Sequence, residues 1–373
     1  MQWKAGKLVL VIAAVTTCTT PKMADADTKS LGFAVTSWST ALYQTAGGKQ
    51  ECPDGLAVGA LNFYIEARPK ARRDELNRLT RNGELDLTDD VGGSQLRIQA
   101  GLQGPGGADI CWNPTLVKRP PMRTVRGTTA YGQDLDGNGH GGGETCEHEE
   151  FTSPDGAAGI DNQWYRLVGC LYGWRAEGGY LEVNQNGEMR DGGLVTLIEI
   201  QGVDRVTEDA TVDVVFSRAL DPLPKDNVGN ILPYGSYRAD PQYQYRTRGH
   251  LRGGVLETEP VDAHFPFYGN LIYGDRLIRG TRLRLKLSAD GAAARGMLAG
   301  YTDISTWWNS MRKLGYTQVA GRFDCPSLYE AAHRLADGYR DPTTGQCTAL
   351  SSAYDIEAVA GFVVHAATRT AGP

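Results

Sequence analysis

Apolar and polar side chains alternate along several segments of this chain, which is the pattern of strands with one buried face. In the clearest case Leu283, Leu285 and Leu287 fall on one side and charged residues fall between them. The segments 193–203 and 210–220 are similarly rich in β-branched and aliphatic residues. The pattern predicts antiparallel strands that bury one face each.

Further strands are expected near both ends of the chain. Residues 32–44 and 354–366 are rich in β-branched, aromatic and small apolar residues. Ala289-Asp290-Gly291 is a hairpin turn signal, and residues 221–241, rich in Pro, Asp and Asn, are expected to form a loop.

Three helices are predicted from their apolar spacing and their start and stop residues. They cover 69–81, a short segment near 305–314, and 325–338, where Pro326 marks the start and Gly338 the stop. The compact aromatic segment 163–174 fits either one helix or one buried strand.

These elements favour a mainly β protein with an antiparallel β-sandwich-like core and a few short helices. The 373 residues include 47 glycines and 17 tyrosines, as expected for many turns and aromatic-rich strands. We divide the chain into an export signal (1–26), a cysteine-containing N-terminal region with an acidic segment (27–185), and an antiparallel β domain (186–373).

The N-terminus has the pattern of a signal peptide. Lys4 and Lys7 precede a short apolar run over 8–15, and Ala24-Asp25-Ala26 supplies a cleavage pattern. The apolar run is too short for a transmembrane helix, and no later stretch is long enough. We therefore expect a secreted or periplasmic protein, with lipid anchoring through Cys18 as the alternative.

Removal of the signal leaves an even number of cysteines, which in an exported chain indicates disulfides. They are Cys52, Cys111, Cys146, Cys170, Cys325 and Cys347. Closeness in sequence favours the pairs Cys325–Cys347, Cys146–Cys170 and Cys52–Cys111. Buried free thiols are the alternative.

Negative charge is concentrated between Gly127 and Tyr165, where there is no Lys or Arg. The eight carboxylates are Asp134, Asp136, Glu144, Glu147, Glu149, Glu150, Asp155 and Asp161. The whole chain carries only −6, so the remainder is slightly positive. Such repulsion must be relieved by solvent, by disorder or by a cation.

The spacing within this segment points to a cation. Asp134, Asp136 and Asn138 alternate and Gly139 follows, which resembles the D-x-D-x-N-G core of calcium loops in EF-hands, dockerins and thrombospondin-type repeats. In such a loop His140 would offer its backbone carbonyl. Position 12 is Thr145 rather than a bidentate acid, so other ligands must come from elsewhere. The predicted metal ligands are Asp134, Asp136, Asn138, His140, Glu144, Glu147, Asp155 and Asp161.

Two other interpretations of the segment stay open. Zinc bound by His140, Cys146 and His148 is one, and a solvated acidic loop is the other. A dinucleotide site at the G-x-G-x-x-G of residues 137–142 is excluded, because no helix follows and the nearby Asp134 and Asp136 would repel phosphate.

Catalytic motifs are absent from the sequence. Asp262 and His264 could form an oriented base, although a structural histidine is the better interpretation. Trp307-Trp308 could form a platform for sugars, but packing between helix and sheet is favoured.

The function expected from the sequence is an exported calcium-binding protein, of a non-catalytic binding or cell-envelope kind. The alternative is a secreted calcium-dependent hydrolase with an unrecognised active site. The partner is unspecified, with carbohydrate or an envelope polymer as examples. The basic strand face of Arg282, Arg284 and Lys286 could contact an acidic polymer, although a solvated face is the simpler interpretation. The net charge gives no reason to expect nucleic acid.

Overall fold

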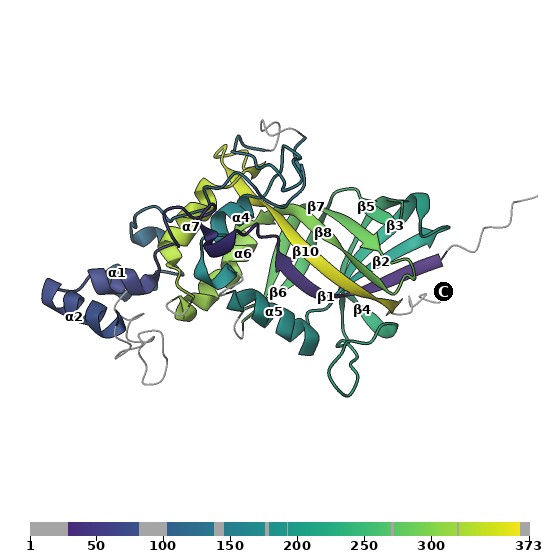
Figure 1. Cartoon of the computed structure of the whole chain (residues 1–373), viewed down its shortest axis with the longest axis horizontal. Coiled ribbons are helices and arrows are strands. Elements are labelled where there is room, and N and C mark those ends of the chain that lie inside the picture. The colour runs from purple at the N-terminus through teal and green to yellow at the C-terminus, as the bar shows by residue number, and fades with distance from the viewer. Residues whose placement is uncertain are drawn as a thin grey trace, which may run out of the picture.

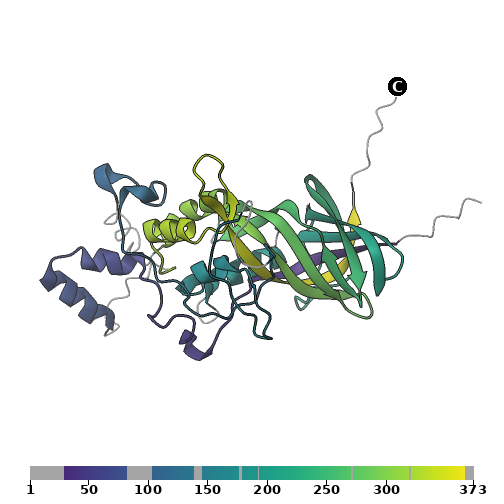
Figure 2. The same cartoon turned by 90° about the horizontal axis from the view of Figure 1, so that it is seen from above.

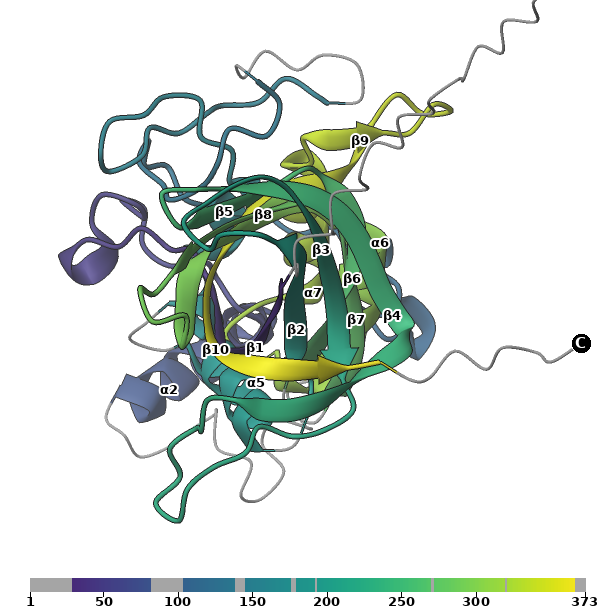
Figure 3. The ribbon, with the colours of Figure 1, turned by 90° about the vertical axis from the view of Figure 1, so that its right-hand side faces the viewer.

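The computed structural model describes residues 29–81, 103–137, 145–175, 179–191, 193–269, 272–318 and 321–365. The predicted signal, including Cys18, lies outside these residues. Within them, eight strands form a closed antiparallel barrel, which Figure 3 shows end-on. In ring order they are β1 (Lys29–Thr40), β2 (Thr196–Val203), β3 (Glu208–Ala219), β4 (Gly235–Arg252), β5 (Val255–Thr258), β7 (Ile272–Leu287), β8 (Ala293–Asp303) and β10 (Cys347–Val364).

The ring closes between the first and the last strand. β1 pairs with β10 from Gly32 opposite Gly361 to Thr40 opposite Tyr354. β6 (Val261–Gly269) adds to β7, and β9 (Gly338–Arg340) adds to β10. β1 begins and β10 ends at the end of the barrel that lies away from the helices (Figure 2).

The predicted sandwich is therefore wrong, and the framework is a barrel. Alternation in sequence reports that a strand buries one face, and this holds equally for a sandwich and a barrel. The pairing of β1 with β10 joins residues more than 300 positions apart, such as Gly32 and Gly361. No local pattern carries that information.

The alternation itself is confirmed. Leu283, Leu285 and Leu287 on β7 are buried, while Arg284 and Lys286 between them are exposed. The predicted turn at 289–291 connects β7 to β8. The loop predicted over 221–241 ends earlier than expected, because β4 begins at Gly235 and pairs with β3.

Helices gather at one end of the barrel. They are α1 (Ala60–Glu66), α2 (Lys70–Arg81), α4 (Gln163–Val168), α5 (Tyr180–Asp191), α6 (Ile304–Met311) and α7 (Cys325–Arg334). Short 3-10 turns cover Ala46–Gly48, Pro105–Gly107, Pro114–Leu116, Tyr172–Trp174 and Arg312–Thr317. α4, α6 and α7 cap the barrel, and α1 and α2 extend beyond them (Figure 1). The three predicted helices are confirmed as α2, α6 and α7, and the segment 163–174 forms α4 with a 3-10 turn. The predicted stop at Gly338 is wrong, because α7 ends at Arg334 and Gly338 begins β9.

α5 covers the part of the β1 edge that β2 does not pair. β2 pairs with β1 only as far as Ala34, which leaves the later part of that β1 edge to α5. The side chains of Asn186 and Glu182 accept hydrogen bonds from the backbone N–H groups of Trp38 (2.8 Å) and Thr40 (2.6 Å). The edge of β1 is thus satisfied by side chains rather than by a neighbouring strand.

All six predicted cysteines form disulfides, but the predicted pairing is wrong. The bonds are Cys52–Cys170, Cys111–Cys325 and Cys146–Cys347, with sequence separations of 118, 214 and 201. Sequence proximity failed because the barrel brings the long segment between β1 and β2 against elements near the C-terminus. The expected bond between Cys325 and Cys347, which would have closed a helix–turn–strand, is therefore absent. Each of these cysteines instead bonds to a cysteine of the long segment, Cys111 and Cys146 respectively. No helix in the described ranges is long and apolar enough to cross a bilayer.

Candidate metal centre

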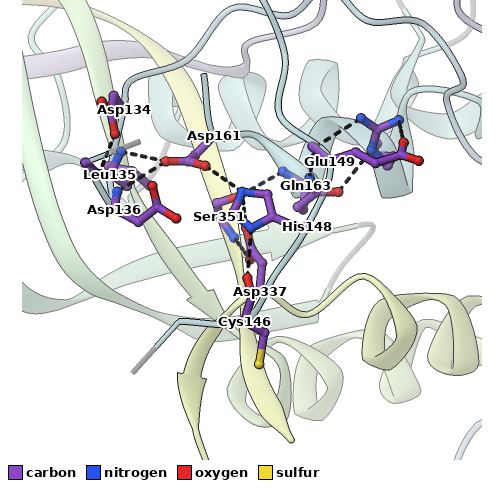
Figure 4. Close-up of polar contacts among 12 residues, drawn as sticks. Asp134, Leu135, Asp136, Cys146, His148, Glu149, Asp161, Gln163, Asp337 and Ser351 are labelled. Carbon is purple, nitrogen blue, oxygen red and sulfur yellow. Dashed lines mark hydrogen bonds and ion pairs between the residues drawn. The ribbon is translucent and has the colours of Figure 1, made fainter. Parts of the chain in front are cut away.

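Three potential metal ligands meet where the acidic segment lies against the barrel. Asp136, His148 and Asp161 each place one ligand atom within 4.8 Å of the others. Figure 4 shows these side chains beside one another, with Asp337 also near the imidazole of His148. The sequence predicted Asp136 and Asp161 in one set and His148 in another, and the structure combines them.

A tight turn attached to the barrel positions Asp136. The backbone N–H of Gly137 donates to the Asp134 carboxylate (2.6 Å), and Arg282 on β7 donates to the carbonyl oxygens of Asp134 and Leu135. The Leu135 side chain is buried against small residues of β8 and β10, including Ala299. Both contacts fix the turn on the outer wall of the barrel.

Asp161 is the central carboxylate of the cluster. Its side chain is 1% exposed, and one oxygen accepts from the backbone N–H groups of Leu135 (2.6 Å) and Asp136 (3.3 Å). The other oxygen lies 2.7 Å from Nε2 of His148. The next residue, Asn162, caps α4 by accepting from the N–H of Tyr165, which holds Asp161 at the start of that helix.

His148 is oriented by a backbone carbonyl. Its Nδ1 lies 3.0 Å from the carbonyl oxygen of Cys146, so Nε2 is the nitrogen that faces Asp161 and Asp337. A carbonyl that fixes one imidazole nitrogen is the usual outer support of a metal-binding histidine. Burial by itself would lower the pKa of His148, but the hydrogen bond to Asp161 and the charge of Asp337 raise it to about 9.

Asp337 is a fourth, fully buried acid that the sequence did not indicate. One oxygen accepts from the N–H of Ser351 (2.7 Å), whereas the other accepts no hydrogen bond from the described residues and lies 3.8 Å from Nε2 of His148. Burial raises the pKa of Asp337 to about 7, against the lowering effect of the His148 charge. The backbone carbonyl of Asp337 also accepts from the N–H of Cys146.

Tyr301 on β8 borders the same cluster. Its hydroxyl is buried and has no hydrogen-bond partner among the described residues. Burial and the charges of Asp337, Asp161 and Asp136 raise its pKa. The hydroxyl therefore remains neutral, and it is a second buried polar group here without a partner.

The other predicted ligands lie elsewhere. Asp134 is exposed and bonds to Gly137, Glu147 is exposed, and Asp155 is exposed and accepts from the Ser153 hydroxyl. Asn138, His140 and Glu144 lie outside the described residues. Cys146 is oxidised, so it offers no thiolate to zinc.

The structure also shows the contacts of two further groups that the sequence analysis considered. His264 pairs with Asp275 on β7, while Asp262 accepts from the N–H of Gly280, so the two do not form the dyad considered. Trp307 and Trp308 are buried, at 1% and 7% exposure, so they pack rather than present a platform for sugars.

The basic face of β7 is engaged in contacts within the protein. Arg282 binds the backbone of the acidic segment, and Arg284 forms an exposed ion pair with Glu257. The N–H groups of Lys286 donate to the carbonyl of Gly253. These contacts fit the simpler interpretation of this face.

The cluster carries an excess of acidic groups and is largely shielded from solvent. Asp136, Asp161 and Asp337 lie around one imidazole, and Arg282 of β7 binds the neighbouring turn. When the acids are ionised, their charge exceeds that of the two cations. A buried excess of this kind is stable only with proton uptake or a bound cation. No protein-family model, curated protein or solved structure matches the chain.

Proposed function

We propose that this chain is an exported protein that binds a divalent cation through Asp136, His148 and Asp161. The observation that carries the proposal is the convergence of these three ligand atoms within 4.8 Å. The ion would connect the turn at Asp136, the approach to α4 and the loop at His148. It would thereby fasten the acidic segment onto the barrel.

The second support is the buried oxygen of Asp337, which accepts no hydrogen bond from the described residues. It lies on the Nε2 side of His148, where a small movement would make it a further ligand or a partner to a ligand. A buried carboxylate oxygen without a partner is costly, and a cation nearby offsets that cost.

The donor set favours zinc over calcium. Calcium takes six to eight oxygen ligands, whereas zinc readily combines imidazole nitrogen with carboxylate oxygens in a four-coordinate site. One of the three converging groups is an imidazole. The calcium-loop pattern began with Asp134, but that carboxylate bonds to Gly137 instead. Calcium remains the competing ion in the experiment below.

A structural ion in a non-catalytic binding or envelope protein fits this burial. Asp161 and His148 have side-chain exposures of 1% and 6%, which leaves little room for a substrate at the ion. Three disulfides support the proposed export, because they persist mainly in oxidising compartments.

The test is isothermal titration of the EDTA-treated protein with zinc and, separately, calcium at pH 7.5. We expect one zinc per chain. Protein stability should rise by about 3 kcal/mol when free zinc exceeds the dissociation constant 100-fold. Asp136→Asn and His148→Gln should each abolish binding, because each removes one converging ligand.

Asp155→Asn is the matched control, since it changes an exposed acid of the same segment and should bind as wild type does. Binding of calcium but not zinc would show that the site holds calcium and would contradict the assignment of zinc. Absence of both, or equal binding by wild type and His148→Gln, would contradict the site.

A further inference from the structure

Arg276 on β7 is a buried cation whose Nε–H group has no acceptor among the described residues. Its residue exposure is 7%, and its Nε is fully shielded without a partner. Neither a hydrogen bond nor an ion pair joins its guanidinium to any residue in the described ranges. Arg166, which is similarly buried, differs because it donates to Gln163 and to the carbonyl of Val125. The Nε–H donor of Arg276 therefore remains to be satisfied.

Aromatic rings surround the guanidinium. Its central carbon lies 5.1 Å from the ring centre of Tyr354, 5.2 Å from Phe267 and 5.7 Å from Trp164. These distances are typical of cation–π contacts, which favour the positive charge. Ring faces do not replace hydrogen-bond acceptors, however, so the shielded Nε–H stays unpaired.

Two residues of the surrounding aromatic cluster also carry buried indole N–H groups without an acceptor. The Nε1 atoms of Trp164 and Trp38 are buried and have no acceptor. Trp164 contacts Arg276 directly, and the Trp38 ring lies 5.4 Å from that of Tyr354. The cluster thus combines a guanidinium with two indole N–H groups, all of which can only donate.

The neighbouring acid does not neutralise Arg276 by contact. Glu182 on α5 is near enough for the Arg276 charge to lower its pKa, although burial raises that pKa overall. Its carboxylate accepts from the backbone N–H of Thr40 at the edge of β1. No ion pair within 4.0 Å links it to Arg276 among the described contacts.

We propose that Arg276 binds one small monovalent anion of the size of chloride, in the aromatic cluster where β7 meets α4 and β10. An anion there would accept charge-assisted hydrogen bonds from the guanidinium, which are about twice as strong as neutral ones. The shielded, apolar surroundings of the guanidinium favour a weakly hydrated ion, because such an ion loses less on leaving water. The anion site is independent of the proposed cation.

The experiment compares thermal unfolding of the EDTA-treated, disulfide-intact protein in sodium chloride and sodium gluconate at equal ionic strength. Chloride should raise Tm saturably, by about 3 °C at ten times its dissociation constant. Arg276→Met should lose the chloride dependence. Arg284→Met, which changes an exposed arginine of the same strand, should keep it.

Glu182→Gln distinguishes two hypotheses: that Arg276 binds an anion, and that the Glu182 carboxylate is its counter-ion. With a bound anion, this variant should keep or increase the chloride dependence, because a competing negative charge is removed. If Glu182 is the counter-ion instead, wild type should show equal Tm in both salts, and the variant should lose stability equally in both. That result overturns the proposal.

A second measurement uses wild-type protein alone, in case Arg276→Met does not fold. Crystals soaked in sodium bromide should show anomalous scattering within hydrogen-bond distance of the Arg276 guanidinium. A soaked crystal without bromide at that position would overturn the proposal irrespective of the variants.

Discussion

The barrel and the loop-rich segment over 103–162 are stabilised in different ways. Barrel strands are joined by continuous hydrogen-bonded ladders around an apolar interior. Ladder pairing in the described parts of the segment is confined to isolated bridges, such as Phe151 opposite Ile160. Two of its residues, Cys111 and Cys146, are instead linked covalently to the C-terminal part of the chain.

The difference explains where the proposed cation site lies. A segment without its own sheet must satisfy its backbone and charges through contacts with a neighbour. Arg282 and Leu135 provide such contacts on the barrel side, and Asp161, His148 and Asp337 provide a buried polar cluster at the boundary. The proposed cation site lies at this boundary because the barrel and the disulfide-linked segment approach each other there.

The largest effect should come from breaking the bond between the two regions with Cys146→Ser and Cys347→Ser together. The bond closes a loop with a sequence separation of 201 residues. In the loop-entropy model its removal costs about 5 kcal/mol. We expect lower stability in guanidinium unfolding and early proteolytic cleavage within the segment.

Leu285→Ala is the control for selectivity. Leu285 is fully buried in the barrel, and its truncation should cost about 2–5 kcal/mol. It should weaken the whole protein without preferential cleavage in the segment. Equal protease resistance of the segment in wild type and in the double cysteine variant would show that the disulfide does not set the difference between regions.

An intermediate effect should appear when pH is varied in the presence of EDTA. The folded pKa of His148 is raised to about 9 from an ordinary value of 6.5, so the folded state binds more protons between these values. Its stabilising contribution is complete below about pH 6.5 and is lost as pH rises through 9. Urea unfolding at pH 6, 7.5 and 9 should therefore show falling stability.

His148→Gln should flatten that slope because the titrating group is gone. Asp337 acts in the same direction at lower pH: its raised pKa means that stability falls as pH rises from about 4 through 7. An unchanged slope above pH 7 in His148→Gln would refute the ionic role assigned to this imidazole.

The smallest effect should come from Asp155→Ala. Asp155 is exposed, and its side chain bonds only locally to the Ser153 hydroxyl. Its removal should change stability by less than about 0.5 kcal/mol, as for most surface substitutions. Asp161→Ala, measured alongside by urea unfolding, should cost several times more because it leaves buried N–H groups and His148 unpaired. Similar losses for both variants would mean that burial does not distinguish the acids of this segment.

Short-range features of the fold could be predicted from the sequence. The alternation of β7, the turn to β8, and the helix that begins with Cys325-Pro326 depend on neighbouring residues. α5 escaped prediction because its polar residues show little apolar periodicity. Its position is set by the side chains that bond to the edge of β1.

Part of the candidate site could be predicted too. The concentration of acids without Lys or Arg placed Asp136 and Asp161 in a cation-binding segment. Asp337 could not be found, because it is an isolated acid 189 positions from His148 in sequence. Only the pairing of Cys146 with Cys347, and of its N–H with the Asp337 carbonyl, brings it to the cluster.

Half-buried strands, short helices, disulfides and a segment with excess negative charge could all be predicted from residue types and their spacing. These properties arise from residue types and spacings within a few turns or strands. Three features became known only from the folded chain. They are the closure of the sheet into a barrel rather than a sandwich, the pairing of the cysteines, and the identity of the acids that lie beside His148. Those outcomes depend on contacts between residues hundreds of positions apart, and such contacts are set by packing of the whole chain.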